Sequence, residues 1–255
     1  MKVALVTAGS GGIGKAIIYK LLDNNYTISV TGRSYSKLED VFSNVPSNRI
    51  LFIETDLTSL TSMASAVEQT IEKFGQLNLL VNNAGGATLY QSIECGTEDS
   101  FNNTFNLNVK STFFMSQYAT PYLIETRGTI LNFSSILASR PAAGLGPYCA
   151  SKAAVEMLTQ TAALELAPKG VRVMCIAPTA IQTEFHVNAG MSQEQANEYY
   201  QNCSKTHPLG RVGQTSDITE LVLFLADSSK SGFMTGSVVH VDGGRLLTSA
   251  SAFKN

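Results

Sequence analysis

Short apolar runs and longer helix-like segments alternate along this chain, from its first residues to a last apolar run at residues 238–241. Each apolar run has the length of a buried strand, and the longer segments repeat apolar side chains at three- and four-residue intervals, as helices do. This alternation predicts parallel strands that are joined by helices and covered by them on both faces. We therefore expect a doubly wound α/β fold with a seven-stranded, mostly parallel sheet.

The expected elements follow one another without a linker or an internal repeat, so residues 1–255 are expected to form a single domain. The expected strands are residues 3–7, 28–31, 50–54, 77–82, 128–135, 171–176 and 238–241. The expected helices are residues 13–22, 37–42, 58–74, 98–123, 148–167 and 216–226. Within the domain we expect a cofactor end at 1–90, a catalytic half at 91–178, a substrate loop at about 179–210, and a C-terminal helix and strand at 211–255.

Composition narrows the class of partner. The chain has 255 residues, 44% hydrophobic and 15% charged, which suits a globular domain with a large core. Its formal net charge is −2 and its basic residues are not clustered, which argues against nucleic acid or an anionic membrane as a partner. Neither a signal peptide nor a membrane-spanning segment is apparent, so we expect a cytoplasmic protein. The cysteines and histidines lack C-x-x-C and H-x-x-x-H spacing, and no metal site is expected.

A glycine-rich turn follows the first expected strand. Residues 7–14 read T-A-G-S-G-G-I-G and lead into the first expected helix. Glycines let a backbone come close to a pyrophosphate, and the N-terminus of a helix supplies free N–H groups and a partial positive charge. Gly9, Gly11 and Gly14 therefore predict a dinucleotide site of the Rossmann type.

The residues after the second expected strand indicate which dinucleotide is bound. Folds that bind NAD place an acidic side chain about 20 residues beyond the glycine turn, where it holds the ribose 2′-hydroxyl. This chain has T-G-R-S at residues 31–34, and its only charge there is Arg33. A guanidinium suits a 2′-phosphate, so Arg33 favours NADP(H) over NAD(H).

Tyr148 and Lys152 stand four residues apart at the start of an expected helix, just after Pro147. Residues at this spacing share a helix face, so we expect the lysine ammonium beside the tyrosine phenol. A nearby cation lowers the pKa of a phenol from its usual value of about 10, and such a phenol can exchange protons near neutral pH. Ser135 ends the expected strand at 128–135, at the edge of the sheet where ligands bind.

Two further segments bear on the substrate and on assembly. Residues 179–210 contain no expected strand, a helical stretch at 192–203, and the aromatic residues Phe185, Tyr199 and Tyr200, which suggest a partly apolar ligand. This segment is either a lid over the substrate or a packing insertion. The expected helix 148–167 is apolar nearly all round, as a helix buried on two faces is, and predicts contact with a second subunit.

These parts together resemble the short-chain dehydrogenase/reductase family over nearly the whole chain. The family's T-G-x-x-x-G-x-G turn corresponds to residues 7–14, with Ala8 in place of the first glycine. Its P-G-x-x-x-T segment corresponds to residues 178–183, with Thr179 in place of the glycine. Further matches are D-L at 56–57, N-N-A-G at 82–85, L-N-V-K at 107–110, G-R-V-G at 210–213, T-G at 235–236 and V-D-G-G at 241–244.

The resemblance implies a catalytic set of Asn108, Ser135, Tyr148 and Lys152. In it Tyr148 gives a proton to the developing alkoxide and Ser135 hydrogen-bonds the same oxygen. Lys152 lowers the phenol pKa and holds the nicotinamide ribose, and Asn108 links Lys152 to solvent through a water. The residues implied to contact the cofactor are Gly9, Ser10, Gly12, Ile13, Gly14, Arg33, Ser34, Asp56, Leu57, Asn83, Ala84, Gly85, Tyr148, Lys152, Pro178, Thr179, Ile181 and Thr183.

The activity implied is hydride transfer between NADP(H) and a small-molecule carbonyl or secondary alcohol, as in a carbonyl reductase. A homotetramer or dimer is implied as well. A 3-oxoacyl-thioester reductase and an NAD-dependent alcohol dehydrogenase of the same family stay open as alternatives, and a non-catalytic nucleotide-binding scaffold is less favoured. A diketone, a sugar, a steroid, an amine ketone and an acyl thioester all remain possible substrates.

Overall fold

The computed structural model describes residues 1–86, 92–184 and 191–248. Within these ranges seven strands form one sheet in the order β3-β2-β1-β4-β5-β6-β7, and every neighbouring pair is parallel. The predicted seven-stranded sheet is confirmed, and it is parallel throughout. The strands are β1 (Lys2–Val6), β2 (Tyr26–Gly32), β3 (Ile50–Glu54), β4 (Leu79–Asn82), β5 (Thr129–Phe133), β6 (Arg172–Pro178) and β7 (Val238–Val241).

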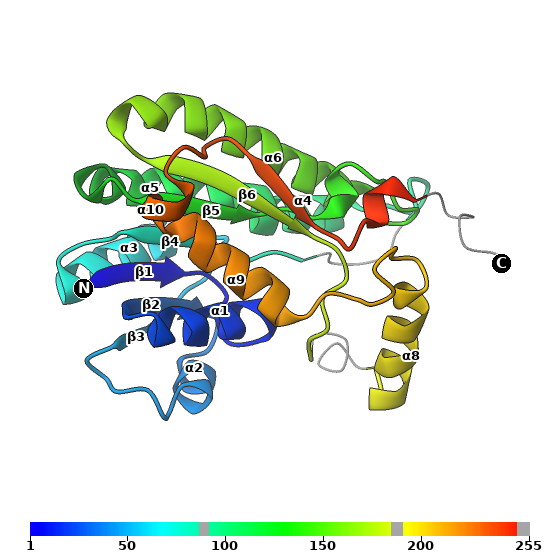
Figure 1. Ribbon diagram of the computed structural model, residues 1–255, viewed down its shortest axis with the longest axis horizontal. Helices are drawn as coiled ribbons and strands as arrows, with labels where there is room; N and C mark the ends of the chain where they lie inside the picture. Colours follow the sequence, from blue (N-terminus) through cyan, green and yellow to red (C-terminus); the bar gives the residue numbers. More distant parts are fainter. Residues whose placement is uncertain (87–91, 185–190, 249–255) are drawn as a thin grey trace.

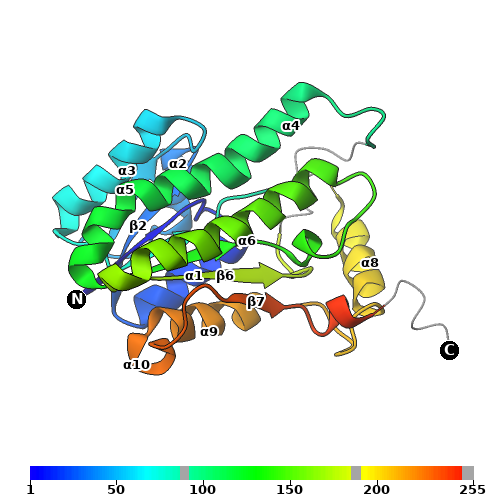
Figure 2. The ribbon, with the colours of Figure 1, turned by 90° about the horizontal axis from the view of Figure 1, so that it is seen from above.

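Helices connect the strands and cover both faces of the sheet (Figures 1 and 2). The α-helices are α1 (Gly12–Asp23), α2 (Tyr35–Val41), α3 (Leu60–Phe74), α4 (Glu98–Phe105), α5 (Ser111–Thr126), α6 (Gly146–Leu166), α8 (Gln193–Ser204), α9 (Thr215–Ala226) and α10 (Ser228–Ser231). A π-helical turn, η1 (Asn106–Lys110), joins α4 to α5. Short 3₁₀ turns are η2 (Ile136–Ala138), η3 (Ala167–Lys169) and η4 (Arg245–Leu247).

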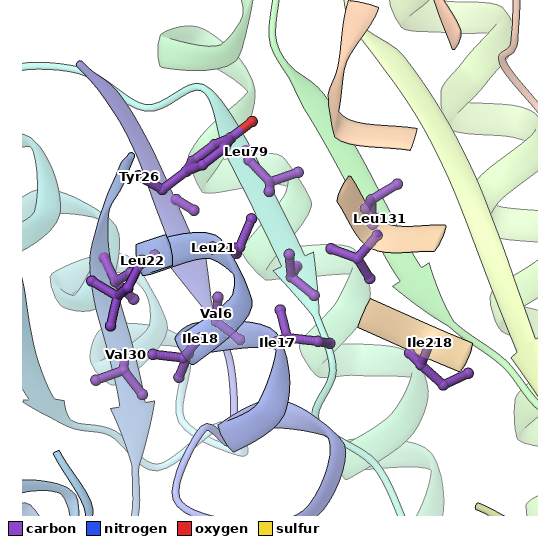
Figure 3. Close-up of a cluster of buried hydrophobic side chains, with 14 of the residues drawn as sticks. Val6, Ile17, Ile18, Leu21, Leu22, Tyr26, Val30, Leu79, Leu131 and Ile218 are labelled. Atoms are coloured by element: carbon purple, nitrogen blue, oxygen red, sulfur yellow. The ribbon is translucent and has the colours of Figure 1, made fainter. Parts of the chain in front are cut away.

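Apolar side chains form one core on each face of the sheet. Helices α1 and α9 bury Ile17, Leu21 and Ile218 against strand residues such as Val6 and Leu131 (Figure 3). On the other face, helices α3 and α5 pack on β1, β4 and β5, where their fully buried residues include Met63, Met115 and Leu123. Because central strands are covered on both sides, they read as continuous apolar runs, and this is why their positions were predictable.

Local signals set the helix boundaries. The Ser59 hydroxyl accepts from the N–H of Ser62 at 3.4 Å and begins α3, and Gly75 ends it in the left-handed region at φ 74°. Ser192 and Gln195 form a capping box at the start of α8, within one residue of the expected helix at 192–203. The helix expected at 98–123 is wrong as one regular element, because the π-helical turn η1 divides it.

The carboxyl ends of the parallel strands meet at one edge of the sheet, and α8 stands beyond that edge in both views (Figures 1 and 2). The order of the strands reverses at β1, which lies between β2 and β4. Open α/β sheets bind ligands at such a reversal. No helix among the described residues has the length and apolar character needed to cross a membrane.

Candidate active site

The glycine turn between β1 and α1 is held against neighbouring strands by backbone groups. The Gly9 N–H donates to the Thr31 carbonyl at 3.0 Å. The Asn83 side-chain amide donates to the carbonyls of Thr7 at 3.0 Å and of Ala8 at 3.2 Å. A Cβ added to Gly14 would lie only 2.6 Å from the Ala8 oxygen, so the turn packs more closely than a residue with a side chain would allow.

Helix α1 begins with an open N-terminus. Gly11 precedes it without a side-chain cap, and the first turn holds no acidic side chain. A Cβ added to Gly11 would meet nothing within 4 Å, so the turn is open on that side, and the first backbone N–H groups of a helix have no partner within it. Partial positive charge at such a position fits the pyrophosphate of a dinucleotide. Ser10 and Ile13 are half-buried beside it, and a Cβ on Gly12 would lie 3.8 Å from that of Thr183.

The ends of β2 and β3 carry the next expected contacts. Arg33 follows β2 and is exposed, and within the described part of the chain no carboxylate forms an ion pair with it. The Ser34 hydroxyl caps α2. The Asp56 carboxylate accepts from the N–H and hydroxyl of Thr58 at 2.8 and 2.7 Å, bonds that hold the pKa of Asp56 below its usual value. Leu57 and Ala84, also expected contacts, are buried.

Ser135 leaves the end of β5 in extended conformation and is nearly buried. Its hydroxyl oxygen accepts from the N–H of Leu137 at 3.2 Å and so caps the 3₁₀ turn η2. The hydroxyl hydrogen is left free by this contact and can be donated to another oxygen. The serine is thereby fixed at the sheet edge with its donor available.

Lys152 is buried on α6 near Tyr148. Only 3% of the lysine is exposed, and its Nζ lies 5.7 Å from the centroid of the Tyr148 ring. The same Nζ donates to the Phe133 carbonyl at 2.9 Å. Burial lowers the pKa of Lys152 from 10.5 to about 8, with a smaller opposite effect from the Cys175 thiol. The ammonium can therefore exchange its proton close to neutral pH.

Asn108 is fully buried in the π-helical turn η1. Hydroxyl groups stabilise this turn, since Ser111 bonds the Leu107 carbonyl and Thr112 bonds the Asn108 carbonyl at 2.8 Å. The Asn108 amide accepts from the Gly86 N–H at 2.9 Å and donates to the Gly86 carbonyl at 3.0 Å. π-helical turns often occur at functional sites, where they aim a side chain that a regular helix would turn away.

Gly85 marks the place where these groups meet. A Cβ built on Gly85 would lie 2.7 Å from the Lys152 Nζ and 3.0 Å from the Asn108 Oδ1. The Asn108 amide also donates to the Ser151 hydroxyl at 2.9 Å, which joins η1 to α6 beside the lysine. The end of β4, the turn η1 and helix α6 are therefore locked together around a buried cation, an arrangement suited to proton transfer.

The segment expected to be a lid is tied to the end of β6 by side chains. Thr179 Oγ1 lies 2.9 Å from His207 Nε2, and His207 Nδ1 lies 2.7 Å from the carbonyl oxygen of Cys203. Since a carbonyl can only accept, Nδ1 is assigned the proton, and in the neutral ring Nε2 accepts from the Thr179 hydroxyl. The pair anchors the C-terminal end of α8 to the strand.

Tyr200 provides a second anchor. Its hydroxyl accepts from the Thr183 N–H at 3.2 Å and donates to the Thr183 and Ile181 carbonyls at 3.1 and 3.4 Å. Of the three aromatic residues that suggest a partly apolar ligand, Tyr200 has a buried ring, and its hydroxyl is used to hold the lid. Tyr199 is half-buried beside it, and Phe185 lies outside the described residues.

Comparison with known proteins identifies the family. Residues 7–245 match the family model described as enoyl-(acyl carrier protein) reductase. The 3-oxoacyl-[acyl-carrier-protein] reductase FabG of Staphylococcus aureus is 33% identical over 250 residues, which cover 96% of this chain and 98% of that protein. The chain belongs to the short-chain dehydrogenase/reductase family. It is an NAD(P)-dependent oxidoreductase that acts on CH–OH groups.

Other members of the short-chain dehydrogenase/reductase family are similarly related. The L-2,3-butanediol dehydrogenase of Corynebacterium glutamicum is 35% identical over 256 residues, covering 96% of this chain and 98% of that protein. A family member of unknown function from Caenorhabditis elegans, solved with cofactor, has a TM-score of 0.88 at 29% identity, covering 98% of this chain and 97% of that one. ElxO with NADP bound has a TM-score of 0.87 at 31% identity, covering 97% and 99%.

The structure places the two departures from the family pattern in different settings. Ala8 adopts φ 54°, a left-handed conformation that favours glycine, so the turn keeps its shape at some conformational cost. Thr179 instead gains a partner, because its hydroxyl meets His207. Neither Ser151 nor His207 belongs to a family motif. The only signals in the sequence are that Ser151 immediately precedes Lys152 and that His207 lies in the segment expected to be a lid.

Proposed function

We propose that this protein is an NADP(H)-dependent carbonyl reductase, which reduces a ketone to a secondary alcohol. The observation that carries the proposal is the meeting of Lys152 and Asn108 at Gly85, with Tyr148 above the lysine. A buried cation beside a phenol at the ligand-binding edge of the sheet serves to move a proton and has little value as a structural contact.

Four side chains have distinct roles in the reduction. The nicotinamide of NADP(H), when bound, supplies a hydride to the carbonyl carbon. The Tyr148 hydroxyl gives its proton to the carbonyl oxygen, and the Ser135 hydroxyl donates a hydrogen bond to the same oxygen. Lys152 would hold the nicotinamide ribose and supply positive charge to the phenol. Asn108 positions the π-helical turn beside Lys152, and a water at this turn would carry protons to solvent.

The cofactor residues follow from the fit of the glycine turn. The open N-terminus of α1 would take the pyrophosphate, and the residues that enclose it are Gly9, Ser10, Gly12, Ile13 and Gly14. Arg33 and Ser34 would take the 2′-phosphate, since Arg33 is exposed and lacks an ion-pair partner in the described chain. The remaining contacts proposed are Asp56, Leu57, Asn83, Ala84, Gly85, Pro178, Ile181 and Thr183, together with the backbone of Thr179, whose hydroxyl meets His207.

Two other activities within the family deserve direct comparison. A 3-oxoacyl-thioester reductase is supported by the Staphylococcus aureus relative and by the description of the matching family model. An NAD-dependent alcohol dehydrogenase would require NAD(H) to be favoured in spite of Arg33. Both activities use the same proton donor, so they differ from the proposal in substrate or cofactor and not in mechanism.

We also propose that the protein acts as a homo-oligomer in the cytoplasm. Helices α5 and α6 lie side by side on one face (Figure 2), and this face exposes large apolar side chains. Met157 and Leu164 on α6 are 62% and 80% exposed, and Phe113 on α5 is 46% exposed. Burial of such a surface in a dimer or tetramer would remove it from water. A monomer in sedimentation at micromolar concentration would contradict this.

The deciding experiment is oxidation of NADPH against a panel of ketones, 3-oxoacyl thioesters and sugars, with NADH in parallel. Turnover of several ketones with NADPH, and much slower turnover with NADH, is the expected result. Equal rates with NADH would end the assignment to Arg33. Binding of NADPH without turnover of any carbonyl would favour the nucleotide-binding scaffold.

A further inference from the structure

Two arginines outside the proposed catalytic set lie at the substrate side of the sheet. Arg140 follows the 3₁₀ turn η2, and its N–H donates to the Ile136 carbonyl at 2.9 Å. This turn is the one that the Ser135 hydroxyl caps, so Arg140 is connected rigidly to the serine. Arg245 begins η4, beyond the end of β7. Both belong to the half of the sheet away from the glycine turn.

The two guanidinium groups converge on one residue. Arg140 Nη1 donates to the Thr248 carbonyl at 2.5 Å and to the Arg245 carbonyl at 3.3 Å. Arg245 Nη1 donates to the Thr248 hydroxyl at 2.8 Å. Both cations are therefore held by Thr248, and each uses only one of its three nitrogens in these contacts. A guanidinium has five N–H donors, so most of them remain for another partner.

No carboxylate of the described residues forms an ion pair with these arginines, and the Asp242 carboxylate beside η4 accepts instead from the N–H groups of Gly244 and Leu246. Residues 87–91, 185–190 and 249–255 contain no aspartate or glutamate, so no acidic side chain from those segments can serve. Burial, and to a smaller degree the neighbouring Arg140, lower the pKa of Arg245. Bringing two like charges together in partly buried positions is costly unless an anion joins them.

The surroundings place this pair against the lid. The Thr248 hydroxyl donates to the Arg245 carbonyl at 3.0 Å and lies 3.4 Å from the Thr206 carbonyl. Thr206 precedes His207, which anchors α8 to Thr179. Figure 2 shows η4 beside the end of α8, at the edge toward which the strands point. The loop from Ser135, the lid and η4 therefore enclose the same corner of the molecule.

We propose that Arg140 and Arg245 bind an anionic group of the substrate, a carboxylate or a phosphate, while its carbonyl lies at Tyr148 and Ser135. This proposal rests on the carbonyl reductase function and specifies the class of ketone that is reduced. Two neighbouring guanidiniums can bind the oxygens of one carboxylate or phosphate through charge-assisted hydrogen bonds. The arginines act on substrate affinity and leave the proton transfer to Tyr148.

The experiment compares ketones that carry an anionic group with related ketones that lack one. Reduction of acetoacetate is measured against its neutral methyl ester, and reduction of 3-oxobutanoyl-CoA against the N-acetylcysteamine thioester, which lacks phosphate. For at least one pair, the anionic member is expected to have a KM about tenfold lower in the unaltered enzyme. Arg245→Gln and Arg140→Gln should each remove that advantage by raising the KM of the anionic ketone, with kcat and the neutral partner little changed.

A matched control removes a charge from the same corner without touching the pair. Lys205 is exposed on the lid and contacts only the Asn202 side chain among described residues, at 2.9 Å. Lys205→Gln should keep the preference for the anionic ketone. Arg245→Lys keeps the positive charge but loses the paired N–H donors of the guanidinium, so it should retain part of the preference for the anionic ketone. A preference in the acetoacetate pair identifies a carboxylate, and one in the thioester pair identifies a phosphate.

The outcomes separate this proposal from the function on which it rests. If neutral ketones are reduced and neither anionic member is favoured, the anion site is wrong and the reductase stands. The same conclusion follows if Arg140→Gln and Arg245→Gln lower turnover of charged and neutral ketones equally. If no ketone of either kind oxidises NADPH although NADPH binds, the reductase function itself fails. Thermal unfolding of each variant shows whether it is folded.

Discussion

The cofactor end and the substrate end of this molecule are built from different kinds of contact. Around the glycine turn, most bonds join backbone groups or a motif side chain to backbone, as when Gly9 bonds the Thr31 carbonyl. Around the lid, side chains far apart in the sequence meet one another, as when Thr179 Oγ1 lies 2.9 Å from Nε2 of His207, 28 residues further along the chain. Close backbone packing restricts which residue types fit, so these positions form a recognisable motif in the sequence. Contacts between side chains that are distant in the sequence form no such motif.

The largest effect is expected where the two ends meet. Tyr148→Phe removes the proton donor while the ring keeps its place above Lys152, so kcat should fall by about 10²–10⁴-fold. The Kd of NADPH, measured by fluorescence titration, should change little because the cofactor end is untouched. Activity close to that of the unaltered enzyme would refute the mechanism. A large loss of NADPH affinity would show that the two ends are not separable.

The buried lysine connects both ends and should appear in the pH profile. Because the pKa of Lys152 is lowered to about 8, kcat for reduction of a neutral ketone should fall about tenfold per pH unit above that value.

The same lowered pKa of Lys152 should affect stability. The folded protein releases this proton near pH 8 and an unfolded chain near 10.5. The unfolded state therefore binds more protons between these values, and stability should rise with pH across that window.

Lys152→Arg provides the control for this profile, because a guanidinium stays charged up to pH 12 and above. Its activity should be lower throughout, but the break near pH 8 should be absent. A break that survives this substitution would assign it to another group. A profile of the unaltered enzyme that is flat to pH 10 would contradict the role of the lysine.

A change confined to the cofactor end should alter the choice of cofactor. Arg33→Ala removes the proposed partner of the 2′-phosphate, and loss of a charge-assisted contact should raise the KM of NADPH about tenfold or more. The KM of NADH and the KM of the ketone should each change by less than about twofold. Equal losses for both cofactors would mean that Arg33 supports the fold of the turn instead. Steady-state kinetics with both cofactors decides between these results.

The same contrast explains what could be predicted from the sequence. The sheet, the position of Tyr148 at the start of α6 and the glycine turn follow from short-range patterns, and the structure has each of them. The break of the expected helix 98–123 did not, because the bonds of Ser111 and Thr112 to carbonyls four residues back are not visible as a pattern. The π-helical turn that they support buries Asn108 beside Lys152.

At the substrate end, the sequence indicated that residues 179–210 are a separate segment but not how they are held. The aromatic residues of this segment suggest a partly apolar ligand, but the sequence does not show which of them lines the pocket. The hydroxyl of Tyr200 bonds the backbone of Thr183 and Ile181, 17 and 19 residues away. Likewise Arg140 and Thr248 are 108 residues apart. Such pairs depend on the folded arrangement, which a single sequence does not specify.

A change confined to the substrate end should have a smaller effect, and it should raise the KM of the ketone and not the KM of the cofactor. Thr179→Val keeps the shape of the side chain but leaves His207 Nε2, in a ring that is 5% exposed, without its partner. We expect the lid to be less well held and the KM of the ketone to rise roughly fivefold, with the KM of NADPH unchanged. Thr179→Ser, which retains the hydroxyl, should behave as the unaltered enzyme. A rise confined to the KM of NADPH would mean that the Thr179 hydroxyl serves the cofactor and not the lid.

The smallest effect is expected in stability alone, at the turn where Ala8 replaces a family glycine. Its φ of 54° is left-handed, and Ala8→Gly should relieve about 1 kcal/mol of backbone strain, partly offset by the greater freedom of glycine in the unfolded chain. The melting temperature should rise by roughly 1–3 °C, with kcat and both KM values unchanged.

Gly12 offers the matched test, because it has the same φ of 54° and a Cβ there would meet Thr183 only at an ordinary 3.8 Å. Gly12→Ala should therefore cost about 1 kcal/mol through backbone strain and not through a clash. Opposite shifts of melting temperature in the two variants would show that φ alone governs both positions. A fall in stability for Ala8→Gly would mean that the methyl group packs usefully against the turn, so that the cofactor end also depends on side-chain contacts.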